Sequence, residues 1–93
     1  MLFVFPEEDQ RSFWMKNVRI DLDIIFLSSD RHIQFLAEAV PHSNPDTPDE
    51  YLARVEGNAQ YALELASGSI SRYGLVIGQE VTFDLPARLH AEE

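Results

Sequence analysis

The segment that decides the fold is Leu22-Asp23-Ile24-Ile25-Phe26-Leu27. Every residue in it except Asp23 is large and apolar. A short and almost continuous apolar run is typical of a strand that is covered on both faces of a sheet. We therefore predict a central strand here, at the deepest point of the core.

Shorter β patterns lie on both sides of this segment. They are separated by Pro, Gly, Ser, Asn and Asp, which are the residues that end strands and form turns. The polar residues 28–31 separate the central strand from a partly alternating segment, so this pair is predicted to form a β-hairpin. The predicted strands cover residues 2–5, 12–16, 22–27, 32–40, 60–66 and 80–85.

Two short helices are also predicted. Thr47, Pro48 and Glu50 resemble a helix start, and this helix is expected to end near Gly57. Residues 67–73 begin with small capping residues and stop at Gly74, which allows one or two helical turns. The prediction is a mainly β domain on the α+β margin, either a small antiparallel β-barrel or a two-layer sheet with one or two short helices.

Length and composition favour one folded domain over residues 1–93, because 45% of the chain is hydrophobic and 25% is charged. The formal net charge of −9 repels phosphates and anionic lipids, so we expect no nucleic-acid and no membrane partner. The absence of cysteine excludes disulfides and thiolate chemistry. The apolar start, residues 1–5, is too short for a signal peptide or a membrane span, and a cytoplasmic location is expected.

The chain resembles the bacterial and archaeal family named domain of unknown function 192 (DUF192). The resemblance rests on Phe13-Trp14-Met15-Lys16-Asn17, on the central apolar segment and on residues 61–68, with Gly74, Gly78 and the opening Met1-Leu2-Phe3-Val4-Phe5 in addition. It implies a compact, predominantly β domain without an assigned biochemical activity. Family members usually carry a further N-terminal segment, so export stays open, and many carry a cysteine in the loop matching residues 41–49.

The first candidate site is formed by Trp14, Lys16 and Asn17. An aromatic ring, a cation and an amide together suit a small anionic or sugar-like ligand. The alternative interpretation is structural, since the lysine stem often packs over an indole on the same face of a strand.

The second candidate site contains Asp23, with Asp21 two residues before it. Two carboxylates on one face of a strand suit acid–base work or a divalent ion, whereas a strand-entry aspartate also commonly accepts backbone N–H groups. Glu64 lies on the opposite face of its strand from Leu63, either in solvent or at the lip of a groove. The three histidines lack metal-ligand spacing, and no metal or cofactor is expected.

Two functions from different classes follow. The favoured one is a non-catalytic domain that binds a small ligand or a protein through a groove around residues 13–17 and Asp23. The alternative is a small hydrolase-like or lyase-like enzyme that uses Asp23 as a base, Lys16 as an electrostatic stabiliser and Glu64 as an acid. A third expectation is self-association through the N-terminal strand, because an uncovered apolar edge invites another chain.

Overall fold

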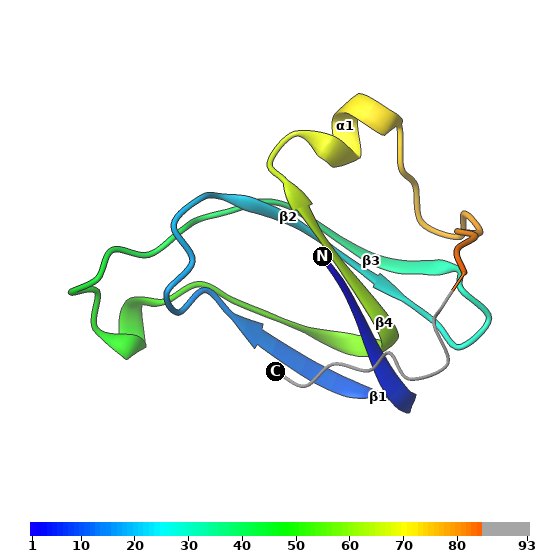
Figure 1. The fold of residues 1–93 in the computed structure, drawn as a ribbon, viewed down its shortest axis with the longest axis horizontal. Helices are drawn as coiled ribbons and strands as arrows, with labels where there is room; N and C mark the ends of the chain where they lie inside the picture. The colour runs from blue at the N-terminus through cyan, green and yellow to red at the C-terminus, as the bar shows by residue number, and fades with distance from the viewer. Residues whose placement is uncertain (85–93) are drawn as a thin grey trace.

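A computed structural model describes residues 1–84. The chain forms one open antiparallel sheet of four strands in the order β1-β4-β2-β3 (Figure 1). The mainly β class is confirmed, but the described sheet does not close into a barrel. The elements are β1 (Leu2–Trp14), β2 (Leu22–Leu27), β3 (Ile33–Val40), the 3₁₀ turn η1 (Asp49–Tyr51), β4 (Arg54–Ala66) and α1 (Ser69–Tyr73).

The central strand β2 lies where the apolar run predicts it, between β4 and β3, and all of its side chains are buried. Alternate side chains of β2 pack into two separate hydrophobic clusters, one on each face of the sheet. Ile24 and Phe26 belong to the first cluster, and Ile25 and Leu27 belong to the second. A strand buried on both faces needs apolar residues at successive positions, and the sequence of β2 meets that need.

Three sequence predictions of strands and helices are corrected. The predicted strand 2–5 and residues 12–14 of the predicted strand 12–16 are the two ends of the single strand β1, whereas residues 15–16 lie beyond its end. β1 continues through Pro6 because Pro6 lies in a bulge of an edge strand, where its missing N–H breaks no ladder. The predicted helix up to Gly57 shrinks to η1, and residues 54–57 begin β4. Of the predicted strand 80–85, Glu80 forms only an isolated bridge to His32, and Leu85 lies outside the described residues.

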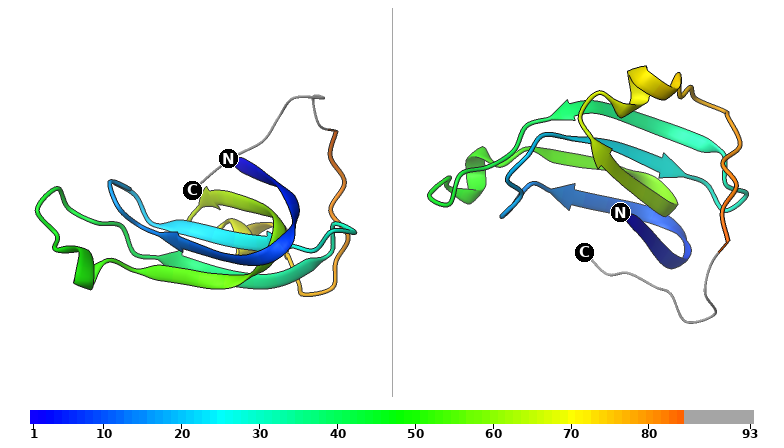
Figure 2. Two further views of the ribbon diagram at one scale, coloured as in Figure 1. Left: turned by 90° about the horizontal axis from the view of Figure 1, so that it is seen from below. Right: turned by 45° about the horizontal axis from the view of Figure 1, so that its top comes forward.

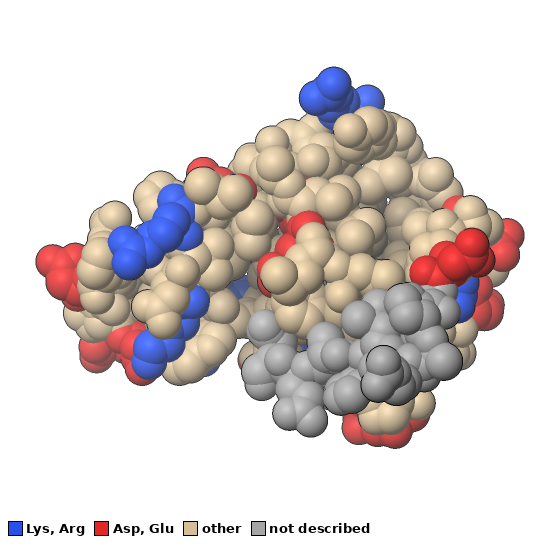
Figure 3. Space-filling view, viewed as in Figure 1, with Lys and Arg blue, Asp and Glu red and all other residues tan. Residues whose placement is uncertain are grey.

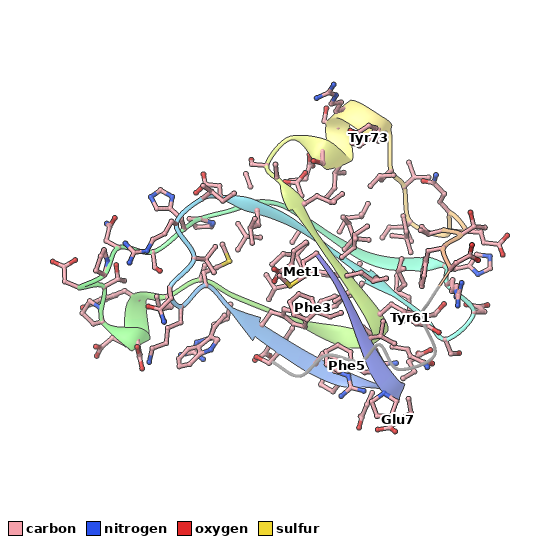
Figure 4. The ribbon with its side chains drawn as sticks, viewed as in Figure 1. Met1, Phe3, Phe5, Glu7, Tyr61 and Tyr73 are labelled. Atoms are coloured by element: carbon pink, nitrogen blue, oxygen red, sulfur yellow. The ribbon has the colours of Figure 1, made fainter. Side chains whose placement is uncertain are left out.

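The bulge between Val4 and Asp9 bends β1, so that its first half runs in a different direction from its second half (Figure 2). Side chains of the first half reach both clusters, Phe5 in the first and Val4 in the second. Phe3 and Phe5 follow one another along this half of the strand (Figure 4). The ring centroid of Phe3 lies 5.3 Å from that of Phe13, edge to face. The bend is stabilised by Glu8, whose carboxylate accepts the Ser29 N–H at 2.7 Å.

The opposite face of the sheet is covered by α1 and by the segment that follows it. Ile70 is buried in the second cluster, and Leu75, Val81 and Phe83 pack against that cluster. The guanidinium of Arg31 lies 4.0 Å from the ring centroid of Phe83 and donates to the Phe83 carbonyl. The described helices include none with the length and apolar character needed to cross a bilayer.

Candidate functional site

The connections β1–β2 and β3–β4 meet at one end of the sheet, which we call the loop end (residues 14–21 and 41–54). Two backbone hydrogen bonds hold them together, from the Met15 N–H to the Ala53 carbonyl at 3.0 Å and from the Ser43 N–H to the Val18 carbonyl at 2.9 Å. Figure 3 shows Lys and Arg side chains gathered there, on the left of the view. The loop end is thus a fixed platform rather than two independent loops.

Two cationic side chains lie close to the indole ring of Trp14 at this end. Arg54 is its cross-strand partner in β4, and the guanidinium carbon lies 4.7 Å from the indole centroid. The Lys16 ammonium lies 5.0 Å from the same ring. The predicted contact between Lys16 and Trp14 is therefore present, and 38% of Trp14 is still exposed to solvent.

Asp49 holds the two cations in place without burying them. Its carboxylate lies 3.3 Å from the Lys16 ammonium, and its backbone carbonyl accepts a hydrogen bond from Arg54 at 3.4 Å. About half of the Lys16 and Asp49 side chains is exposed, at 47% and 56%. Exposed ion pairs contribute little, so an incoming anion can compete with Asp49 for both cations.

Asn17 contributes through its backbone. It adopts a left-handed conformation with φ of 61°, and the turn closes when the Val18 N–H donates to the Met15 carbonyl at 3.4 Å. Asparagine tolerates this conformation better than most residues. Asn17 therefore turns the chain directly after Lys16, and its side chain is exposed.

Asp23 is the second residue of β2, two positions beyond the loop end in sequence, and is fully buried, at 0% exposed. One of its carboxylate oxygens accepts the Ala39 N–H at 2.9 Å, and the other accepts the Ile70 N–H at 2.8 Å. Burial raises the pKa of Asp23, but the backbone hydrogen bonds lower it by more, so the net pKa lies below the ordinary value. The carboxylate thus joins β2 to β3 and α1.

Glu64 lies on the other face of the sheet from Asp23. It pairs across strands with Ile24, the neighbour of Asp23 in β2, and successive residues of a strand face opposite sides. Partial burial raises the pKa of Glu64. The structure therefore does not bring Asp23, Lys16 and Glu64 into one pocket.

One pair that was not expected from the sequence joins Asp21 to His42. The Asp21 carboxylate lies 2.6 Å from the His42 Nδ1 and accepts the His42 backbone N–H at 2.9 Å. Hydrogen bonds from His42 hold the pKa of Asp21 below its ordinary value. Within residues 1–84, no three His, Cys, Asp or Glu side chains gather closely enough to hold a metal ion.

The sequence reasoning also missed Arg54 and Asp49. Both are more than thirty residues from Trp14 in sequence, and only the β1–β4 register places Arg54 opposite Trp14. The available signal is Trp14 itself, because a tryptophan at a strand end beside a lysine invites a search for a second cation.

The sequence profile of DUF192, a family described as "Uncharacterized ACR", matches residues 1–83. The chain belongs to this family. Within the DUF192 match lie all four strands, the loop end and Asp23.

Two solved structures are similar to this DUF192 chain. One, from Sinorhizobium meliloti 1021, is described as a "putative transcription regulator", with 37% identity and a TM-score of 0.69 over 84% of this chain and 57% of the other. The second, of a protein of unknown function from Novosphingobium aromaticivorans DSM 12444, has 30% identity and a TM-score of 0.70 over 89% of this chain and 56% of the other. The chain thus spans little more than half of each solved chain. The search of curated proteins gives no significant match.

Proposed function

We propose that this DUF192 domain is a non-catalytic binding domain whose contact surface is the loop end, with Trp14, Lys16 and Arg54 at its centre. The carrying observation is the pair of cations within 5.0 Å of the centroid of one solvent-exposed indole. An exposed aromatic ring beside donors held at fixed positions is the usual make-up of a small-ligand subsite. Asn17, next to Lys16, adds an exposed amide.

The ligand that suits this surface best is a sugar acid. The apolar face of a pyranose ring covers the open part of the indole, while its carboxylate meets the Lys16 ammonium and the Arg54 guanidinium. Arginine binds carboxylates through paired N–H donors, which fixes their orientation. The carboxylate of the ligand then replaces the Asp49 carboxylate beside the Lys16 ammonium.

Binding is a better proposal than the hydrolase-like or lyase-like alternative. That enzyme needs Asp23 as an accessible base, yet both of its carboxylate oxygens accept backbone N–H groups in the interior. A general base must reach the proton that it removes, either directly or through one water molecule. The hydrogen bonds of Asp23 give it a structural role instead, because they join β3 and α1 to β2.

The description of the Sinorhizobium relative as a transcription regulator does not change the proposal. A net charge of −9 opposes contact with the phosphate backbone of DNA, and one subsite with two cations offsets little of it. A small ligand with a single carboxylate meets only the local charge of Lys16 and Arg54. We therefore propose ligand binding rather than DNA binding for this surface.

The test uses the intrinsic fluorescence of Trp14, which is the single tryptophan of the chain. Titration with glucuronate is expected to change the intensity or the wavelength of its emission in a saturable way. Glucose, which has the ring without the carboxylate, and acetate, which has the carboxylate without the ring, should each bind at least about tenfold more weakly.

Matched variants separate the subsite from unspecific charge effects. Lys16→Ala and Arg54→Ala should each weaken glucuronate binding by about tenfold, the loss expected for one charge-assisted contact. Arg72→Ala is the control, because Arg72 lies over Tyr73 on α1, away from the loop end. Equal responses to glucuronate and glucose, or an equal loss in Arg72→Ala, would contradict the proposal.

A further inference from the structure

The outer edge of β3 is open along most of its length. β3 lies at one margin of the sheet and pairs with β2 on its inner side only. Within residues 1–84, the outer side accepts a neighbour only at its first residues. Edge strands of this kind present unpaired N–H and C=O groups to any extended chain that approaches them.

The protein already uses the start of this edge to hold an extended segment. The Ile33 N–H donates to the Gln79 carbonyl at 2.9 Å, and the Gly78 N–H donates to the Ile33 carbonyl at 2.7 Å. The Val81 N–H donates to the Arg31 carbonyl at 2.9 Å, and the bridge between His32 and Glu80 is antiparallel. The backbone of this edge is therefore oriented correctly to accept a further strand.

The open stretch runs from Gln34 to Glu38. It begins where the bridge to residues 78–81 ends, and each of its ends is a bulge: the register with β2 shifts at Gln34, and again at Glu38 and Ala39, where the φ of Ala39 is 51°. Five residues of strand span roughly 17 Å and match about five residues of a partner, of which two or three point to each face. The length of the accepted segment is thus limited at both ends by features of the fold.

The other margin of the sheet is protected against such pairing. β1 carries a proline at position 6, a bulge between Val4 and Asp9, and acidic residues at 7, 8 and 9. Proline, bulges and charges are the means by which natural sheets block edge pairing. Self-association through the N-terminal strand stays a prediction. The β3 edge also has bulges, but it carries no proline and one acidic residue, Glu38, so it is the better placed of the two edges for a partner.

Exposed apolar side chains lie next to the hydrogen-bonded start of β3. Val76 and Ile77 come directly before Gly78, which is bonded to Ile33, and they are 58% and 60% exposed. The segment after α1 descends beside the start of β3 in Figure 1. Leu36, half-buried at the edge itself, packs against the second cluster on the same side of the sheet as Leu75.

We propose that the outer edge of β3, from Gln34 to Glu38, binds an extended, basic and apolar peptide segment of a partner protein as an added antiparallel strand. Backbone hydrogen bonds supply the ladder, and Val76, Ile77 and Leu36 receive apolar side chains of the segment. Such strand addition is a recurrent mode of peptide recognition. This surface is separate from the loop end, so the inference is independent of the proposed ligand.

The charge of the partner follows from the ends of the stretch. Glu38 and Glu80 are both exposed, one at each end of the open edge, and the domain as a whole carries −9. Opposite charge on the partner lowers the repulsion and steers the approach. A second copy of the chain would bring a further −9 to the contact, which makes it a poorer occupant than a basic segment.

The test uses an acetylated and amidated octapeptide of alternating lysine and valine, with a fluorescent label for anisotropy. A second octapeptide has the same sequence and charge, but carries a backbone N-methyl group at every residue, which removes the donors along both edges. The unmodified peptide should bind at least about tenfold more tightly. Amide hydrogen exchange should slow at residues 34–38 when it binds.

Variants on the flanking surface complete the design. Val76→Ala and Ile77→Ala should each weaken the unmodified peptide severalfold, because each removes an exposed apolar contact without opening the core. Ile20→Ala is the matched control, since Ile20 is 59% exposed at the loop end. Its affinity for the peptide should equal that of the unchanged protein.

Several outcomes would overturn the proposal. Equal affinity for the two octapeptides would mean that charge alone drives the contact, and no binding would mean that the edge accepts no strand. Slowed exchange within β1 instead of residues 34–38 would place the contact elsewhere. Protection of residues 34–38 that rises with protein concentration in the absence of peptide would identify a second copy as the occupant.

Discussion

The carboxylate of Asp23 accepts the backbone N–H of Ala39 at 2.9 Å, and Ala39 is the residue with a left-handed φ of 51° at the bulge of β3. The second oxygen of the same carboxylate accepts the Ile70 N–H at the start of α1. A buried side chain thus joins an edge strand and a helix to the central strand. The shape of this end of the sheet depends on one residue of β2.

Asp23→Asn is expected to destabilise the fold by about 1–3 kcal/mol, because an amide has one acceptor oxygen and brings donors toward N–H groups. The change keeps the size of the side chain, so lost hydrogen bonding accounts for the effect. Denaturant unfolding measures it. Asp46→Asn, on the exposed β3–β4 connection, is the control and should leave stability unchanged.

Acid should remove the contribution of Asp23. Its pKa in the folded state lies below that of the unfolded chain, so its stabilisation is fully present above about pH 4 and is lost as pH falls through the folded value. The free energies of unfolding of the unchanged protein and of Asp23→Asn should therefore converge as the solution is acidified. A gap that stays constant down to the lowest pH at which both proteins fold would contradict this linkage.

Glu64 should show the opposite dependence. Burial raises its pKa, so the ionised side chain is disfavoured in the folded state and any cost grows as pH rises through the folded value. Glu64→Gln should therefore melt at a higher temperature than the unchanged protein at neutral pH. The difference should disappear under acid conditions, where Glu64 is protonated in both states. A variant that melts lower at neutral pH would show that the ionised carboxylate stabilises the fold.

Phe26→Ala should cost about 3–5 kcal/mol, the range for truncating a large core aromatic residue. The ring is fully buried, with centroids 5.5 Å from Phe13 and 5.3 Å from Phe35. Chemical denaturation, or loss of the folded signal altogether, reports this cost. Tyr51→Ala, 77% exposed at the loop end, should change stability by much less.

Gly57→Ala should destabilise by about 1–3 kcal/mol through overpacking. A Cβ at position 57 would lie 2.9 Å from the Cδ2 of Phe26, inside the contact distance of two carbon atoms. Combining Gly57→Ala with Phe26→Leu should cost less than the sum of the two single changes, because the smaller side chain leaves room for the methyl group. Strict additivity in this double-mutant cycle would argue that Phe26 does not restrict position 57.

Short sequence patterns predict the elements that form from residues close together in the chain. The apolar run of β2, the hairpin to β3 and the short helix before Gly74 lie where the sequence placed them. Pro6 misled the prediction, since a proline ends a strand in the interior of a sheet but is tolerated in a bulge at its edge. Whether the sheet closes into a barrel depends on the bending of its long strands. No short stretch of sequence determines that bending.

The candidate site divides in the same way. Residues two apart in a strand share one face, so the sequence predicts Lys16 beside Trp14. The Lys16 ammonium does lie over the Trp14 ring, although Lys16 follows the end of β1. Arg54 joins them only through the pairing of β1 with β4, which is a long-range property. The sequence allows Asp23 to be either a structural acceptor or a site residue. Its partners Ala39 and Ile70 come from two elements that no local pattern places against it.

The strand order has a consequence for synthesis on the ribosome. β4 is the neighbour of both β1 and β2, so β1 has no partner in the sheet until residues 54–66 have left the exit tunnel. Before that point only the β2–β3 hairpin joins segments that are already made. Pairings between segments distant in sequence form slowly, and apolar segments that wait for them are exposed to aggregation. Residues 2–5 are therefore the part of the nascent chain that most needs shielding, and slow translation just before β4 would lengthen that period.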